Sequence, residues 1–170
     1  MAKFEGKFES ASQEWETPLG LFDALDKYFD FNFDLAADSD NKKCERFFSK
    51  KDNALSKNWV GRCWLNPPYG GSGENKLAIW VEKAYNESRK KNCSVTMLIP
   101  ARTNTNWWHD FCMKANEIFL IKGRPKFGGA KHGLPQPLSV IHFDGIDARS
   151  TAKFSTISLK TENIYQSKCV

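Results

Sequence analysis

Four consecutive residues, Asn66, Pro67, Pro68 and Tyr69, carry the groups needed to hold a flat ring that bears an amine. The Asn66 side-chain oxygen and the Pro67 carbonyl can each accept one N–H of an exocyclic NH2 group, which draws the nitrogen lone pair out of conjugation. Tyr69 can stack on the ring. The nitrogen then becomes nucleophilic without a strong base. The alternative is a strand-ending turn, in which the prolines only stop the strand and Tyr69 packs on the core.

The segment before these residues is predicted to be a buried strand. Residues 60–65 are apolar apart from Gly61 and Arg62, and a short apolar run that meets a Pro-Pro pair is typical of a strand entering a rigid loop. Because neither proline has an N–H, the loop cannot continue the sheet. The carbonyl groups around Asn66 are therefore left as fixed acceptors.

Helices and strands are predicted to alternate along the rest of the chain. Helices are predicted with Thr17 as N-cap and Pro18 at the first position, running to about residue 29, then over residues 76–90 and from residue 106. Strands are predicted over residues 29–33, 60–65, 94–100, 117–121 and 137–143. This order predicts an α/β fold that ends in a closing antiparallel hairpin.

The chain is predicted to form one domain, because 170 residues with 41% hydrophobic side chains can bury a single core. We place this domain at residues 14–145. It is preceded by a polar, flexible N-terminus of residues 1–13 and followed by a C-terminal extension of uncertain structure, residues 146–170. Within that extension the alternation over residues 154–159 allows an edge strand or a dispensable tail.

Two acidic side chains are candidates for binding a cofactor. Asp34 follows a predicted strand, where an open α/β sheet binds its ligand, so it could hold a cationic amino group. It could equally cap the next turn. Asp52, in the long polar connection of residues 38–58, could accept a hydrogen bond from an adenine ring or could simply be solvated. No Gly-x-Gly-x-x-Gly follows the strand, which argues against a nicotinamide or flavin site.

Basic side chains in two loops could contact phosphate groups. Arg102 follows the strand predicted over residues 94–100. A glycine-rich loop near the end of the domain carries Arg124, Lys126, Lys131 and His132. Such a loop fits contact with a DNA backbone, but a solvated hairpin loop is an equal alternative. Trp107 and Trp108 could stack on bases, although paired aromatic side chains more often belong to a core.

Composition narrows the classes of partner and site. The net charge of +5 is compatible with a polyanion without proving one. Five cysteines at wide spacings include no Cys-x-x-Cys pair, so we predict no disulfide framework and no metal site. The first residues are charged and lack the apolar stretch typical of a signal peptide, and no run approaches 18 apolar residues. We therefore expect a cytoplasmic protein that binds no membrane and is a monomer or weak dimer.

Four ordered stretches go together: Trp15-Glu16-Thr17-Pro18-Leu19 with Leu21-Phe22, Phe33-Asp34-Leu35-Ala36-Ala37 with Asn41, Trp64-Leu65-Asn66-Pro67-Pro68-Tyr69-Gly70, and Leu98-Ile99-Pro100-Ala101-Arg102-Thr103 with Trp107-Trp108. They resemble the phage N6-adenine DNA methyltransferases, the Dam-like phage family, over about residues 13–144. The resemblance implies a shortened Rossmann-like methyltransferase sheet, S-adenosylmethionine as cofactor, and adenine in double-stranded DNA as substrate.

The resemblance also implies roles for individual residues. The implied catalytic residues are Asn66, Pro67, Pro68 and Tyr69. The implied cofactor contacts are Asp34, Ala36, Thr17 and Pro18 at the methionine end, and Asp52 at the adenosine. The methyl group would pass directly to the amine of a base flipped out of the duplex, and Asn rather than Ser at the head of the motif favours adenine over cytosine.

Two departures from methyltransferases at large stand beside this resemblance. Residues 34–39 replace the usual glycine-rich cofactor loop, and we expect no separate target-recognition domain. Sequence specificity is therefore expected to be low or to come from residues 124–132. Two other functions stay open: a methyltransferase acting on protein glutamine or RNA, and a non-catalytic nucleic-acid-binding protein on the same fold.

Overall fold

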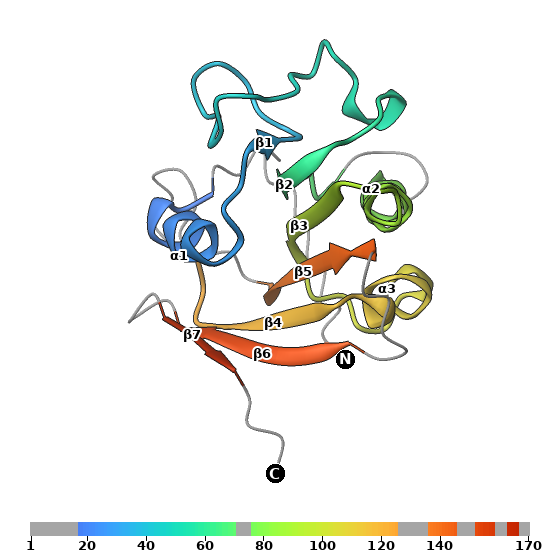
Figure 1. The fold of residues 1–170 in the computed structure, drawn as a ribbon. Coiled ribbons are helices and arrows are strands. Elements are labelled where there is room, and N and C mark those ends of the chain that lie inside the picture. Colours follow the sequence, from blue (N-terminus) through green and yellow to red (C-terminus); the bar gives the residue numbers. More distant parts are fainter. Residues whose placement is uncertain (1–16, 71–75, 126–135, 146–151, 159–162, 167–170) are drawn as a thin grey trace, which may run out of the picture.

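The computed structural model describes residues 17–70, 76–125, 136–145, 152–158 and 163–166 (Figure 1). Within them, seven strands form one mixed sheet in the order β1-β2-β3-β5-β4-β6-β7. The strands are β1 (Phe33–Asp34), β2 (Gly61–Leu65), β3 (Cys93–Pro100), β4 (Glu117–Lys122), β5 (Leu138–Asp144), β6 (Lys153–Ser158) and β7 (Asn163–Gln166). The predictions of an α/β fold and of an antiparallel pair formed by β4 and β5 are confirmed.

Strand direction brings several loops to one edge of the sheet. β2 is parallel to β1 and β3, and β6 is parallel to β4. β5 is antiparallel to both of its neighbours, β3 and β4, so β4 runs in the same direction as β3. The carboxyl ends of β1, β2, β3, β4 and β6 therefore lie at the same edge, which we call the carboxyl edge. Ligands of open α/β sheets bind outside such an edge.

Helices cover both faces of the sheet, with α1 (Leu19–Phe29) on one side and α2 (Lys76–Ser88) and α3 (Asn106–Asp110) on the other (Figure 1). The apolar stripe of α1 packs with Trp64, Leu98 and Phe119. The stripe of α2 packs with Cys63 and Val95, which point to the opposite face because side chains alternate along a strand. No helix in the described part of the chain has the length and apolar character to span a bilayer.

Two predictions at the start of the chain are wrong. Thr17 is not the N-cap of α1: Pro18 occupies that position, without a side-chain cap hydrogen bond. The strand predicted from residue 29 begins only at Phe33, because α1 continues to Phe29 and ends where Asp30 adopts a left-handed conformation with φ 52°. Phe29 and Phe31 pack against the cluster around Trp64, whereas Phe33 lies in β1 and packs in the core on the other face of the sheet.

The sheet extends beyond residue 145. β6 lies between β4 and β7, so the segment around residue 154 is an inner strand of the sheet rather than an edge strand. Buried Glu117 joins β4 to β6, since its carboxylate accepts a hydrogen bond from the Ser155 hydroxyl and lies 3.3 Å from the Lys153 ammonium. A charged pair held inside two neighbouring strands fixes their register.

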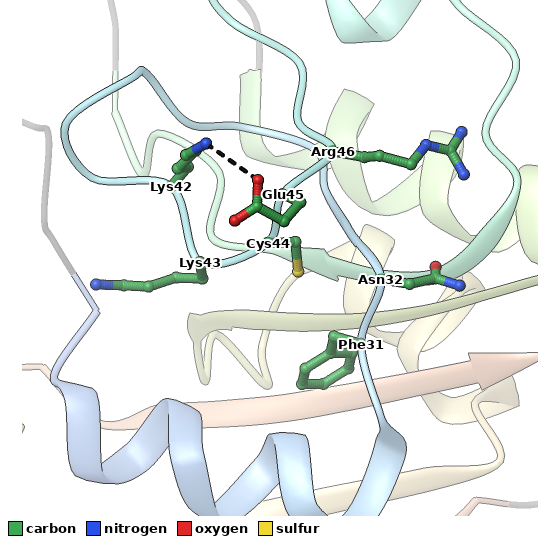
Figure 2. Close-up of a pocket in the computed structure, with 7 residues that line it drawn as sticks. All are labelled: Phe31, Asn32, Lys42, Lys43, Cys44, Glu45 and Arg46. Carbon is green, nitrogen blue, oxygen red and sulfur yellow. Dashed lines mark ion pairs between the residues drawn. The ribbon is translucent and has the colours of Figure 1, made fainter.

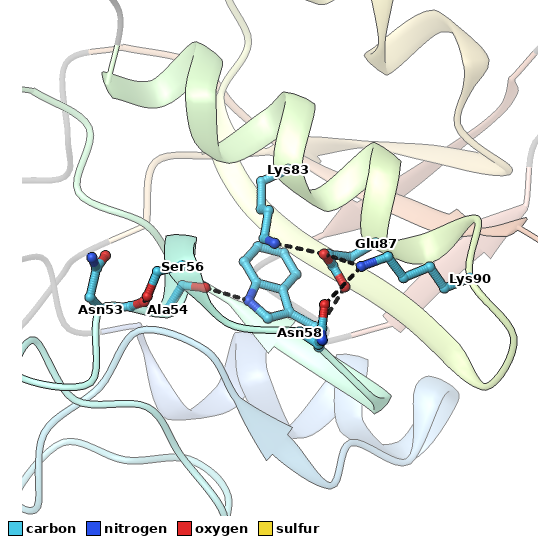
Figure 3. Close-up of polar contacts among 8 residues, drawn as sticks. Asn53, Ala54, Ser56, Asn58, Lys83, Glu87 and Lys90 are labelled. Carbon is cyan, nitrogen blue, oxygen red and sulfur yellow. Dashed lines mark hydrogen bonds and ion pairs between the residues drawn. The ribbon is translucent and has the colours of Figure 1, made fainter.

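The connection between β1 and β2, residues 35–60, is irregular as predicted, apart from the short helix η1 (Ala54–Ser56). Its far end is tied to α2 by Glu87, whose side chain is 3% exposed (Figure 3). That carboxylate accepts hydrogen bonds from the Trp59 N–H at 3.0 Å, Lys83 Nζ at 2.6 Å and Lys90 Nζ at 2.7 Å. The Trp59 indole N–H in turn donates to the Ala54 carbonyl at 2.8 Å.

Replacing Glu87 with Ala should lower the free energy of unfolding by about 2–4 kcal/mol, because it leaves the buried Trp59 N–H and two lysines without their shared acceptor. Burial alone would raise the pKa of Glu87, but these donors outweigh it and hold the pKa below its ordinary value. In the wild type, the stabilisation by Glu87 is therefore fully present above the ordinary pKa of a glutamate. It is lost as the pH falls through the lowered pKa of Glu87 in the folded protein. Urea unfolding at neutral and acidic pH measures both effects. Exposed Glu82→Ala on the same helix is the control, and an equal, small change in both variants would contradict the assignment.

Candidate active site

The Asn-Pro-Pro-Tyr segment lies at the carboxyl end of β2, between two parallel neighbours. Cys63, Trp64 and Leu65 at the end of this strand are fully buried, so the strand end is held by packing on both faces. Asn66 is the first residue beyond it and is partly exposed. The carboxyl edge therefore presents the Asn66 side chain on a rigid support.

The Asn66 amide is held from both ends. Its Nδ2 donates to Thr17 Oγ1 at 3.0 Å, and its Oδ1 accepts from the Tyr69 hydroxyl at 2.8 Å. Thr17 is 4% exposed and Tyr69 is 5% exposed, so both contacts are shielded from water. Because the Thr17 oxygen takes the NH2 group, the amide oxygen must face the other way. That oxygen has two lone pairs, and the Tyr69 hydroxyl occupies one of them.

The Tyr69 ring packs on the core in this structure, with Trp64 and Leu98 in its cluster. Burial raises the pKa of the Tyr69 phenol well above its ordinary value, so the hydroxyl stays protonated and acts as a donor. Tyr69 thus contributes a hydrogen bond to Asn66 here, rather than an exposed face on which a ring could stack.

Asp34 lies on the strand next to this loop, opposite Trp64 in the register. It is 3% exposed, and its two carboxylate oxygens accept hydrogen bonds from the Ala36 N–H at 3.2 Å and the Lys43 N–H at 3.0 Å. Burial raises the pKa of Asp34 in spite of these donors. The carboxylate therefore caps the turn after β1, which is one of the two alternatives that the sequence left open. A carboxylate oxygen can accept more than one hydrogen bond, so these two backbone donors do not exhaust the capacity of Asp34.

Three other residues are implied as cofactor contacts: Pro18 and Ala36 lie close in sequence to Thr17 and Asp34, and Asp52 lies in the connection between β1 and β2. Pro18, the N-cap of α1, is next to Thr17, and Ala36 follows Asp34 at the carboxyl edge. Asp52 is exposed, and its carboxylate accepts from the Ser49 N–H at 2.7 Å and the Ser49 hydroxyl at 2.6 Å. Those bonds lower the pKa of Asp52. Asp52 thus closes a local turn in this structure.

The candidate DNA contacts separate into exposed and buried groups. Arg102 and Arg124 are exposed in the loops after β3 and β4, both at the carboxyl edge. Trp107 and Trp108 are buried in the core beneath α2, so the packing alternative describes them. Lys126, Lys131 and His132 lie outside the described residues.

A hollow of about 460 Å³ lies beside the start of β1 (Figure 2). It is lined by Phe31, Asn32, Lys42, Lys43, Cys44, Glu45 and Arg46. None of the candidate site residues lines it, and Phe31 and Asn32 precede β1 rather than follow it. The hollow still adjoins Asp34, because Lys43, which lines it, donates its N–H to the Asp34 carboxylate.

Comparison with known proteins identifies the family. The family described as DNA N-6-adenine-methyltransferase (Dam) matches residues 7–148, most of the chain. This chain belongs to that Dam family. The Dam-family match spans the Asn-Pro-Pro-Tyr loop, Thr17 and Asp34 together, so the resemblance of the sequence motifs is confirmed.

Individual relatives of this Dam-family chain come from phages and a bacterium. It is 37% identical over 112 residues to a DNA N-6-adenine-methyltransferase of Escherichia phage T1, covering 64% of this chain and 44% of the relative. It is 37% identical over 111 residues to one of Haemophilus phage HP1, covering 63% and 61%. The putative methyltransferase YfdM of Escherichia coli K12 is 32% identical over 71 residues, covering 37% and 78%. The chain thus spans about half the length of the two phage relatives.

Proposed function

We propose that this chain transfers the methyl group of S-adenosylmethionine to the N6 amine of adenine in double-stranded DNA, on a shortened Rossmann-like methyltransferase sheet. The observation that carries the proposal is the Asn66 amide, oriented by Thr17 at the carboxyl edge beside buried Asp34. Family membership supports the reaction class.

Asn66 and Pro67 are proposed to bind the amine. Asn66 Oδ1 and the Pro67 carbonyl each accept one N–H, which turns the nitrogen lone pair out of conjugation with the ring and toward the incoming methyl group. Thr17 prevents the amide from turning its NH2 toward the substrate, since that NH2 is engaged at 3.0 Å. An amide turned the other way would repel the amine rather than bind it.

Asp34 is proposed to hold the cationic amino group of the cofactor. A buried carboxylate beside backbone donors favours a cation that pairs with it, and the residues present fit the methionine end of S-adenosylmethionine. When bound, that cofactor supplies an electrophilic methyl group that bonds to the amine nitrogen as its bond to sulfur breaks, while the amine releases a proton to water. No residue needs to be a strong base, in keeping with the protonated Tyr69.

The first test is incubation of unmodified duplex DNA with methyl-labelled S-adenosylmethionine, followed by nucleoside analysis. N6-methyladenine is the expected product. N4-methylcytosine would change the base and leave the mechanism in place. Label in protein or RNA but not in DNA would mean that the substrate is a protein or an RNA. If neither label nor cofactor binding is detected, the chain is a non-catalytic nucleic-acid-binding protein.

Replacing Thr17 with Val should lower the turnover number about tenfold, because the isosteric side chain keeps the packing but removes the acceptor that fixes the Asn66 amide. The affinity for S-adenosylmethionine, measured by calorimetry, should stay unchanged. Thr17→Ser retains the hydroxyl and should restore most of the rate. A large loss of cofactor affinity in Thr17→Val would instead support the direct cofactor contact implied by the sequence.

A further inference from the structure

The connection between β1 and β2 carries a concentrated positive charge. Residues 42–57 contain six Lys or Arg and two Asp or Glu residues, a net charge of +4, whereas the whole chain has +5. The six cations are Lys42, Lys43, Arg46, Lys50, Lys51 and Lys57, and all but Lys43 are exposed. Like charges close together in the chain repel one another, so such a segment is suited to a polyanion.

Residues 49–52, which we call the lysine turn, present two of these cations together. The Asp52 N–H donates to the Ser49 carbonyl at 3.0 Å, and the Asp52 carboxylate accepts from the Ser49 N–H and hydroxyl. Lys50 and Lys51 therefore occupy the two central positions of a turn closed on both sides, with exposed side chains. The turn holds two adjacent ammonium groups on a defined backbone, despite their mutual repulsion.

The lysine turn lies at the carboxyl edge, as does the Asn-Pro-Pro-Tyr segment, residues 66–69, which is the proposed catalytic loop. Phe47 bridges to Asp34 in parallel, and the Phe48 N–H donates to the Asp34 carbonyl at 2.8 Å. The chain thus runs toward the carboxyl edge as it passes β1, and the turn follows Phe48 directly. Asn66 follows the neighbouring strand at the same edge. The ends of β1 and β2 are hydrogen-bonded to each other, since the Leu35 N–H donates to the Trp64 carbonyl at 2.9 Å.

Exposed cations therefore lie on both sides of the catalytic loop along the carboxyl edge. In the strand order, the lysine turn is beyond β1, Asn66 follows β2, and Arg102 and Arg124 follow β3 and β4. A DNA duplex bound along this edge would contact positive charge on both sides of the base that is flipped out.

We propose that the lysine turn binds the phosphate backbone of duplex DNA on the β1 side of the catalytic loop. The inference rests on the proposed function, because it takes DNA as the substrate. It also gives Asp52 a different role from the adenosine contact implied by the sequence: Asp52 closes the turn that aims Lys50 and Lys51.

The direct test is the salt dependence of duplex binding by the full chain, measured by fluorescence anisotropy. The double variant Lys50→Ala/Lys51→Ala should bind more weakly. The slope of log affinity against log salt should shrink by about 0.9 for each phosphate that is no longer neutralised, about two units if both lysines bind. The control is Lys27→Ala/Lys91→Ala, which removes two exposed lysines elsewhere and should leave the slope unchanged. A wild-type slope in the lysine-turn variant would overturn the proposal, as would a slope change seen with duplex RNA but not with DNA.

Asp52→Ala separates the two roles of that residue. The variant should lose part of the DNA affinity and retain the wild-type affinity for S-adenosylmethionine in calorimetry. Weaker cofactor binding with unchanged DNA binding would overturn the turn-closing role. These measurements need no methyl transfer: a protein that shows the slope change but makes no N6-methyladenine contradicts the proposed function alone, and one that methylates DNA with an unchanged slope contradicts the lysine turn alone.

Discussion

Replacing Asn66 with Ala should lower the turnover number for methyl transfer by about a thousandfold, close to the limit of detection. The amide oxygen of Asn66 is the side-chain acceptor in the proposed amine site, and it is fixed by the contact of Nδ2 with Thr17. Without it, the Pro67 carbonyl would bind one N–H and the nitrogen lone pair would stay conjugated with the ring. The measurement is single-turnover transfer of label to saturating duplex DNA.

The fold should survive this substitution, because Asn66 is partly exposed in a loop beyond β2. Unfolding midpoint and cofactor affinity are therefore expected within error of the wild type. Asn86→Ala, at an exposed position of α2, is the matched control and should keep full activity. If Asn66→Ala transfers label at close to the wild-type rate, the amine site lies elsewhere and the mechanism is wrong.

Local patterns were enough to predict the elements that carry the site. The apolar run that ends at Leu65 and the stripe of Leu77 and Val81 reflect packing of one strand and one helix against the core, which is a property of neighbouring residues. Both elements lie where the sequence predicted them. Asp34 was likewise placed correctly at a strand end, although β1 is shorter than expected.

Contacts between distant residues could not be predicted in the same way. Thr17 meets Asn66 across 49 positions of sequence, and no local pattern distinguishes an N-cap threonine from one whose hydroxyl accepts from another loop. The position of β6 inside the sheet also depends on pairing with β4, which an alternating segment does not specify.

The charge pattern could have located the lysine turn. The glycine-rich loop after Gly123 is the basic segment that the sequence motifs favour, but residues 42–57 carry the same net charge, +4, as the 16 residues 118–133 that contain this loop. What the sequence lacks is the direction of that segment: the parallel bridge of Phe47 to Asp34 brings its lysines to the carboxyl edge. The charge density of this segment indicates a polyanion as ligand. Only the topology of the sheet shows that the lysine turn lies at the same edge as Asn66.

Tyr69→Ala and Tyr69→Phe should have opposite consequences, although they change the same residue. Tyr69→Ala removes the ring on which the sequence predicts that adenine stacks, and should lower the turnover number by about 10- to 100-fold, since base–aromatic stacking contributes about 1–3 kcal/mol. Tyr69→Phe keeps the ring and removes the hydroxyl that donates to Asn66 Oδ1 at 2.8 Å. In this structure that hydroxyl occupies one acceptor position of the proposed amine site, and the buried ring must leave the core to stack on a base.

Tyr69→Phe should therefore keep or raise the rate at limiting DNA, because the incoming amine no longer displaces a hydroxyl from the same oxygen. Its pH–rate profile should match that of the wild type, since burial raises the pKa of the Tyr69 phenol and keeps the hydroxyl from acting as a base. The comparison uses kcat/KM for duplex DNA from about pH 6 to about pH 9, a range that lies below the ordinary pKa of a phenol. If Tyr69→Phe is as slow as Tyr69→Ala, the hydroxyl itself takes part in the reaction, and its contact with Asn66 is a productive one rather than one that the substrate replaces.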